Sequence, residues 1–399
     1  MKRIIALSLT LLMLLAFAVA CAKTETPPAS SAPPDSPAAS SEAPPAASTP
    51  APAQDNSGNI THSGVGFYSD DADWFGRDAY KIAYICYAYT FLNQLLSSAF
   101  EEWADRINYS YEVYDSAEDM NNFMSAMETY ASMGFDGFLL DPDPTVSVRV
   151  KQYAEELDIP FLPVVNPMMD ADGNHRIAPG VDLDGYTLGG RQTDWLVENY
   201  QSYWGDVDPA DIGFIFLYLS ANENLILNME GSRDRFQEIW PDTFSTNFIE
   251  GDMLGYAVSA QGGFEYTSTV VTAHPEFKYW FIASCIEDLG QGGARMAEDL
   301  GIESNVLICT NGVNWLMQDW ENGYDGCWAS GIYYAQSIFA EPLVCGLIAL
   351  IEGRTTMETI WGNYQREGET YSVYSVDTRL VTKDTYKDYL DEIARYLAQ

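Results

Sequence analysis

Amide and carboxylate side chains follow the apolar runs of this sequence at several places. Asn166 comes after the run at residues 160–165, and Asn311 comes after the run at residues 306–309. Planar amides and carboxylates can hydrogen-bond adjacent hydroxyl groups, while an aromatic ring covers the apolar face of the same molecule. Polar residues directly after buried strands therefore indicate reversible binding of a small polar molecule, most readily a sugar.

Groups suited to covalent or metal chemistry do not come together in the sequence. The three histidines, His62, His175 and His274, are far apart, and no two have the spacing of metal ligands. There is no nucleophile-elbow motif, no phosphate-binding glycine loop and no cysteine beside a histidine. We expect neither an enzyme nor a bound cofactor or metal.

The first residues have the pattern of an export signal. Lys2 and Arg3 precede an apolar run over residues 4–19, which is too short to span a bilayer comfortably. Small residues then lead into Cys21, and this site resembles the lipobox of bacterial lipoproteins. The resemblance implies a signal peptide over residues 1–20 and lipidation of Cys21. An ordinary signal peptide with an incidental cysteine is the alternative.

The segment that follows is rich in Pro, Ala, Ser and Thr. It has too little apolar surface to offset the entropy of ordering, so residues 21–61 are predicted to be a disordered linker. No later stretch is long and apolar enough for a membrane helix. We expect an extracytoplasmic body that is attached to the cell membrane through its lipid anchor alone.

Composition limits the partners of this body. A formal net charge of −38 and a pI of about 4.1 leave no basic patch for phosphates, so nucleic acid is not expected. The chain after the linker exceeds the usual size of one core, which favours two lobes. The five cysteines beyond Cys21 are predicted to be buried free thiols, since they lie in apolar runs: Cys86, Cys285, Cys309, Cys327 and Cys345.

Short apolar runs alternate with amphipathic stretches from residue 80 onward. Tyr80–Cys86 is predicted to be a strand, and residues 91–106 carry apolar side chains at helical spacing. The alternation restarts after residue 184, and it includes a strand predicted over residues 243–249. This β-α-β rhythm implies parallel strands with right-handed crossovers, so we predict an α/β fold of two doubly wound, Rossmann-like lobes.

Five passages resemble, in order, those of the type I periplasmic binding proteins of the ribose and galactose kind. The resemblance covers essentially all of residues 79–385, and its passages are residues 134–140 (GFDGFLL), 181–189, 283–294, 307–312 and 380–383. It implies two lobes joined by a three-strand hinge. We expect the hinge near residues 182–185, 311–314 and 328–336.

The resemblance also implies a site. Ligands of doubly wound sheets meet the loops at the carboxyl ends of the strands. The predicted ligand-binding residues in these loops are Tyr89, Phe91, Asp143, Asn166, Asn224, Glu287, Asn311, Trp315, Tyr334 and Gln336. Tyr89 and Phe91 are equally suited to a lobe core, while Asp141 and Asp288 are suited to helix capping.

The sequence departs from the family where its sugar binders carry arginines. Pro167 stands after the fourth strand, and Glu230 or Ser232 stands early in the sixth helix. Arg233 and Arg235 are nearby, but their offset indicates the outer face of the helix. Without guanidinium groups the site loses bidentate clamps for hydroxyls. A different sugar, a polyol, a nucleoside or a cationic solute are the alternatives.

The family resemblance finally implies a partner and domain boundaries. The loaded protein would deliver its ligand to an ABC transporter permease, or alternatively dock on a receptor kinase or chemoreceptor as a sensor. The N-terminal lobe is predicted to comprise residues 79–183 and about 337–365. The C-terminal lobe is predicted to comprise residues 184–336 and about 366–399.

Overall fold

The computed structural model describes residues 62–220, 222–366 and 368–398. The predicted signal peptide, Cys21 and the whole of the predicted linker, residues 21–61, lie outside these residues. The strands are β1 (Tyr80–Cys86), β2 (Tyr109–Asp115), β3 (Gly137–Asp141), β4 (Phe161–Pro163), β5 (Gly180–Asp182), β6 (Ile212–Tyr218), β7 (Phe248–Asp252), β8 (Tyr279–Ser284), β9 (Val306–Asn311), β10 (Trp328–Tyr333), β11 (Val373–Ser375) and β12 (Arg379–Thr382). The α-helices are α1 (Phe91–Ile107), α2 (Met120–Ser132), α3 (Ser147–Glu156), α4 (Gly185–Trp204), α5 (Glu223–Ile239), α6 (Phe244–Asn247), α7 (Ala260–Ala273), α8 (Glu287–Leu300), α9 (Asn314–Glu321), α10 (Gln336–Ile351) and α11 (Tyr386–Leu397).

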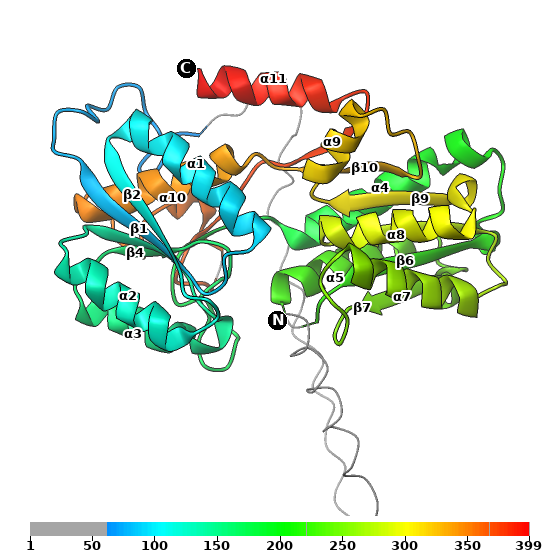
Figure 1. The fold of residues 1–399 in the computed structure, drawn as a ribbon, viewed down its shortest axis with the longest axis horizontal. Helices are drawn as coiled ribbons and strands as arrows, with labels where there is room; N and C mark the ends of the chain where they lie inside the picture. The colour runs from blue at the N-terminus through cyan, green and yellow to red at the C-terminus, as the bar shows by residue number, and fades with distance from the viewer. Residues whose placement is uncertain (1–61, 221, 367, 399) are drawn as a thin grey trace, which may run out of the picture. The chain divides into compact units, whose positions relative to one another are not determined.

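The first lobe is built on a four-stranded parallel sheet in the order β2-β1-β3-β4. Both faces of the sheet are covered by helices, as Figure 1 shows, so its inner strands are apolar on both sides. Ile82 and Tyr84 pack into the core that contains α1 and α10. Ala83 and Ile85, which point the other way, pack into the core that contains α2 and α3. Continuous apolar runs therefore became central strands here.

The second lobe is built on a six-stranded sheet in the order β12-β10-β9-β8-β6-β7. Its strands are parallel except for β12, which pairs antiparallel with β10. Phe214 and Phe281 lie in one core with Phe236 of α5. Ile215 and Ile282 lie in the other core, on the face of the sheet covered by α7 and α8. The predicted α/β fold with two Rossmann-like lobes is confirmed.

A small third sheet lies at the first passage between the lobes. β5 pairs in parallel with β11, with Val181 opposite Tyr374. A further passage joins β10 to α10, which packs against α1 and β3 of the first lobe. The crossing predicted at residues 311–314 is wrong, because β9 and β10 both belong to the second sheet. The turn between β9 and α9 therefore stays within one lobe.

The strand predicted over residues 243–249 is also wrong in its first half. Residues Phe244–Asn247 form α6, and β7 begins only at Phe248. The Asn247 side chain donates to the carbonyl of Ile212 at 2.8 Å and to that of Pro209 at 3.1 Å. These bonds fix the turn beside the start of β6. Aromatic and β-branched residues favoured a strand locally, but tertiary hydrogen bonds decided the helix.

The cysteine prediction is confirmed within the described residues. Cys86, Cys285, Cys309, Cys327 and Cys345 are all buried and free. Burial raises the pKa of the Cys285 and Cys309 thiols to about 12. Thiols of this kind behave as small apolar side chains and are poor nucleophiles near neutral pH.

Across the described ranges, no helix has both the length and the apolar character needed to cross a membrane.

A buried carboxylate inside α10 joins both ends of the described chain. Glu341 accepts hydrogen bonds from the Tyr396 hydroxyl at 2.5 Å and from the backbone N–H of Tyr68 at 3.1 Å. One of its oxygens also lies 2.7 Å from His62 Nδ1. The helix is otherwise apolar all round, as expected for one covered on every side. Glu341 is therefore a structural group that holds residues 62–68 and α11 against the first lobe.

Helices α4 and α5 of the second lobe touch backbone to backbone. A Cβ added at Gly189 of α4 would lie 1.8 Å from the carbonyl oxygen of Asn228 in α5. One added at Gly231 of α5 would lie 1.9 Å from the carbonyl oxygen of Tyr186 in α4. Only glycine fits at these positions, because a helix backbone cannot move aside as a flexible side chain can.

We expect Gly189→Ala to lower the free energy of unfolding by about 1–3 kcal/mol, because the added methyl group overpacks the α4–α5 contact. Gly190→Ala is the matched control, since the nearest atom to its added Cβ lies at 3.8 Å. Alanine there should be neutral or should stabilise the helix by about 0.5–1 kcal/mol. Chemical denaturation of both variants measures the difference. Equal stabilities would contradict the close packing of α4 on α5.

Candidate functional site

A buried carboxylate lies at the carboxyl end of the first sheet. Asp141, the last residue of β3, is 5% exposed. Its Oδ2 accepts a hydrogen bond from Asn93 Nδ2 at 2.7 Å, and its Oδ1 accepts one from Asn166 Nδ2 at 3.0 Å. The backbone N–H of Asn166 also reaches Oδ1 at 3.3 Å. Three neutral donors therefore hold one carboxylate.

The parallel pairing of the strands brings these residues together. Cys86 at the end of β1 lies opposite Asp141, and β4 runs beside β3 on its other side. Asn93 lies in the first turn of α1, where it forms a capping box with Thr90. Its amide nitrogen also lies 2.6 Å from the Tyr84 hydroxyl. The loops after β1, β3 and β4 thus meet at one edge of the sheet.

Burial raises the pKa of Asp141 to about 6, and the hydrogen bonds from Asn93 and Asn166 oppose this rise. A carboxylate that loses water is destabilised in its charged form, while donors that point at it stabilise that form. Since the donors are neutral amides, they compensate only part of the cost of burial.

A second buried carboxylate lies at the carboxyl edge of the second sheet. Glu287, the first residue of α8, is 6% exposed. Its Oε1 accepts from the backbone N–H of Trp315 at 2.6 Å and of Leu316 at 3.2 Å, and Asn314 Nδ2 lies 3.4 Å from its Oε2. Glu287 therefore caps the N-terminus of α9, where a negative charge is favourable.

Burial raises the pKa of Glu287 to about 7, against the lowering effect of the bonds from the first turn of α9. Burial also raises the pKa of the Tyr334 hydroxyl, and the charge of Glu287 is a further cause. Tyr334 lies on the passage between β10 and α10, so a residue of this passage is close to the buried carboxylate.

Asn311 ends β9 next to this carboxylate. Its Oδ1 is buried and has no hydrogen-bond partner among the described residues. Gly312 follows with φ of +91°, and a Cβ there would lie 3.0 Å from the Glu287 Cβ. A buried acceptor without a donor is costly, so Asn311 is suited to receive a hydrogen bond from a ligand.

Two contacts join the first lobe, which holds the Asp141 cluster (Asn93, Asp141 and Asn166), to the second lobe, which holds the Glu287 cluster (Glu287, Asn311 and the first turn of α9). The Phe91 and Trp315 rings stack with centroids 4.9 Å apart and planes at 19°. Asn222 Nδ2 lies 3.5 Å from Asn166 Oδ1. Phe91 stands at the N-terminus of α1 and Trp315 near that of α9, each close to one of the buried carboxylates. Amides, carboxylates and aromatic rings from both lobes therefore come together.

Some predicted site residues have structural partners instead. Asp143 caps a short 3-10 helix (Pro144–Val146), where its side chain accepts from Thr145 N at 2.9 Å. Asn224 donates to Asp182 of β5 at 2.9 Å, next to the Arg176–Asp182 ion pair. Ligand roles for Asp143 and Asn224 remain predictions, while both side chains already stabilise turns.

The helix-capping role predicted as the alternative for Asp141 is wrong, because Asp143 is the residue that caps the following helix. Asp141 and Asn93 were not among the predicted ligand-binding residues, although both belong to the Asp141 cluster. The sequence did contain a signal for both residues, since Asp141 ends an apolar run and Asn93 lies three residues after the capping Thr90. Local sequence could not distinguish a capping Asp141 from a buried one, because both Asp141 and Asp143 precede a proline.

Four further residues were predicted for the site. Tyr89, Trp315 and Tyr334 are half-buried against the main core, and Gln336 is the first residue of α10. Arg233 pairs with Asp234 and Glu250, and Arg235 pairs with Asp194 and Glu238. The predicted placement of both arginines away from the site agrees with these pairs.

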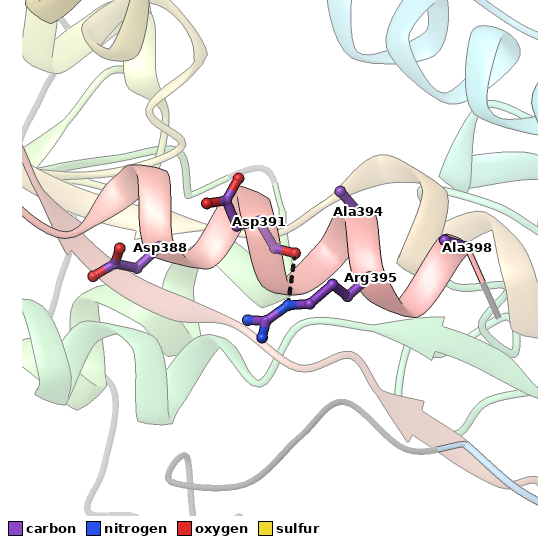
Figure 2. Close-up of a pocket in the computed structure, with 5 residues that line it drawn as sticks. All are labelled: Asp388, Asp391, Ala394, Arg395 and Ala398. Carbon is purple, nitrogen blue, oxygen red and sulfur yellow. Dashed lines mark hydrogen bonds between the residues drawn. The ribbon is translucent and has the colours of Figure 1, made fainter.

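A surface hollow along α11 has a different character. Figure 2 shows that Asp388, Asp391, Ala394, Arg395 and Ala398 line it from a single helix. Arg395 Nε donates to the backbone carbonyl of Asp391 at 3.1 Å. The hollow shares no residue with the two clusters and has no aromatic ring in its lining.

Within the described residues there is also no group of three or more histidine, cysteine or acidic side chains that could hold a metal.

Solved structures resemble more than three quarters of the chain. A galactofuranose binding protein is 14% identical with a TM-score of 0.60, over 78% of this chain and 98% of that chain. An ABC transporter periplasmic solute binding protein from Actinobacillus succinogenes with bound D-allose is 16% identical with a TM-score of 0.60, over 78% and 100%.

The transcription regulator CcpA of Lactococcus lactis has the same fold, at 12% identity and a TM-score of 0.55 over 76% of this chain and 98% of that chain. No protein-family model and no curated protein matches the sequence. The two-lobed arrangement of parallel sheets nevertheless agrees with these structures over more than three quarters of the chain. The chain therefore has the fold of the type I periplasmic binding proteins.

Proposed function

We propose that this protein is an extracytoplasmic solute-binding lipoprotein that captures a small polar ligand, most readily a sugar, between its lobes. The observation that carries the proposal is the meeting of two polar clusters, around Asp141 and Glu287, at the Phe91–Trp315 ring stack. Amide and carboxylate oxygens accept from hydroxyl groups, and the rings offer apolar faces to C–H surfaces. The sugar-binding proteins of the same fold support the choice of ligand.

Two lobes joined by narrow passages suit a binding protein, because a ligand that contacts both lobes stabilises their closed arrangement. We propose lobe boundaries at residues 79–183 with about 337–365, and 184–336 with about 366–399. The packing of α10 on α1 and the pairing of β12 with β10 support this division. Bending would then occur at the β5–β11 pair and at the passage from β10 to α10.

The proposed partner is an ABC transporter permease that receives the ligand from the closed lobes. The proposed anchor is a lipid on Cys21, with membrane contact through this lipid alone. The small residues before Cys21 and the polar segment after it support this arrangement. Catalysis is not part of the proposal, since the site residues lack a paired nucleophile and base.

A screen of the purified protein against sugars, polyols, nucleosides and amino acids tests the ligand class. A ligand that binds only the native state raises the melting temperature by mass action. A sugar that raises it in a concentration-dependent manner would support the proposal. A stabilising effect from nucleosides or amino acids alone would assign the site to another class.

We expect Asn311→Ala to weaken binding of a ligand found in this screen by about ten- to a hundredfold, because a ligand donor loses its partner in the closed site. Since Asn311 Oδ1 has no partner among the described residues, the melting temperature of the empty protein should not fall. Titration calorimetry and thermal melts provide the two measurements.

Asn305→Ala is the matched control for this variant. Asn305 precedes β9 at the opposite end of the strand, where its side chain donates to the Lys278 carbonyl at 3.2 Å. Affinity should be unchanged in this control. Native affinity in the Asn311 variant would exclude Asn311 from the site.

We expect Cys21→Ser to release the protein from membranes or to leave the precursor uncleaved, because serine lacks the thiol that receives the lipid. Fractionation of cells and mass spectrometry of the N-terminus measure both results. Cys345→Ser, which alters a buried thiol of α10, controls for the general effect of losing a cysteine. Unchanged membrane retention of the Cys21→Ser variant, with its N-terminus processed at the same position, would refute lipidation.

A further inference from the structure

Neutral donors hold the two buried carboxyls of the site. Asp141 accepts from the side-chain amides of Asn93 and Asn166, and Glu287 accepts from backbone N–H groups at the start of α9. Within the described residues, no lysine, arginine or histidine forms an ion pair with either of them. Buried charges are normally paired with an opposite charge or a metal. In this site the described part of the chain supplies no such cation.

The titratable groups that face the two carboxyls do not change this balance. Tyr84 and Cys86 lie near Asp141, and Tyr334 lies near Glu287. Phenols and thiols with raised pKa values are neutral near pH 7, so none of them compensates a carboxylate. At any pH at which Asp141 and Glu287 are ionised, the negative charge of their carboxylates is therefore not compensated by these groups.

The aromatic rings at the site also have no cationic side chain over them from residues 62–220, 222–366 or 368–398. Arginine and lysine side chains lie over other rings in the described chain, such as Tyr80, Trp103 and Tyr389, and not over Phe91 or Trp315. Ring faces attract cations through their quadrupole, most strongly in a desolvated site. Asn311 Oδ1 adds a buried acceptor to which no described residue donates. Each of these groups interacts favourably with a positively charged donor.

We infer that the ligand carries a protonated amino group beside its hydroxyl groups, as an amino sugar or an amino polyol does. The inference rests on the proposed function of the site as a binder of small polyhydroxylated ligands. An ammonium group would be attracted by both carboxylates and could donate to Asn311. The hydroxyls of the same ligand would bond the amides of the first cluster.

Proton release provides a direct signature of such a ligand. In the empty protein the pKa of Glu287 is about 7 and that of Asp141 is about 6, because both are raised by burial. A bound cation stabilises the ionised carboxyls and lowers both pKa values. Near pH 7 the protein should therefore release protons as a cationic ligand binds, whereas a neutral ligand should release few or none.

The test compares ligands that differ only in the amino group. Glucosamine is paired with glucose, galactosamine with galactose, and 1-amino-1-deoxyglucitol with glucitol. Titration calorimetry of the full chain at pH 7, in two buffers of different ionisation enthalpy, gives the affinity and the number of protons exchanged. The protonated aminoglucitol should bind at least about tenfold more tightly than glucitol, with net release of protons.

Two variants locate the effect on the protein. Glu287→Gln keeps an oxygen that can accept from the first turn of α9, but it removes the charge, so the amine preference should fall about tenfold or more. Glu298→Gln is the matched control, since Glu298 is an exposed residue of the same helix, α8. This control removes the same net charge and should leave the preference unchanged. A melting curve of each variant shows whether it remains folded.

The outcomes separate this inference from the proposed function. Tighter binding of the amines with proton release supports the inference. Equal or tighter binding of the neutral partners overturns the inference and leaves the proposed function in place. If no sugar, polyol or amine in the panel binds, the proposed function fails, and the inference fails with it.

Discussion

The candidate site depends on one geometric constraint, the parallel pairing of strands within each sheet. Parallel strands end at a common edge, so residues that follow different strands meet there although they are far apart in the chain. In the first lobe this brings Asn93, Asp141 and Asn166 together after β1, β3 and β4. In the second lobe it brings Glu287 and Asn311 together after β8 and β9. The right-handed crossovers place the helices on the faces and leave this edge for loops.

Burial of two carboxyls near the ring stack is the main energetic cost of this arrangement. The first lobe reduces the cost with side-chain amides, and the second reduces it with the N-terminus of a helix. Glu287 thereby serves two purposes, because the bonds that stabilise its charge also fix the start of α9 and the backbone of Trp315. Glu287 therefore holds the backbone of the residue whose ring stacks on Phe91.

Close helix packing makes the second lobe a compact support for its half of the site. Gly189 and Gly231 let α4 and α5 touch, and Gly263 and Gly292 do the same for α7 and α8. The interior of such a lobe is packed too closely to deform continuously. Movement is therefore expected where the chain passes between lobes, at β5 with β11 and at the segment from β10 to α10. Tyr334 belongs to this segment and lies near Glu287, which connects the passage to the site.

The sequence by itself determined the α/β class and most of the elements. Continuous apolar runs such as Tyr80–Cys86 become central strands because both faces of a parallel sheet are buried. It also determined the burial of the cysteines. The place of Asn311 at the end of β9 agrees with a polar residue that follows such a run, while its role toward a ligand stays a prediction. These features depend on local composition and period, which can be read without knowledge of distant contacts.

Only the tertiary structure decided which polar residue belongs to the buried Asp141 cluster and which belongs to a turn. Asp141 and Asp143 both precede a proline, yet only the neighbours Asn93 and Asn166, brought by other strands, make Asp141 the buried one. The helix at Phe244–Asn247 depends likewise on the carbonyls of Pro209 and Ile212, more than thirty residues away. Hydrogen bonds between distant segments have no periodic signature in the sequence, because their partners are set by sheet register and helix packing.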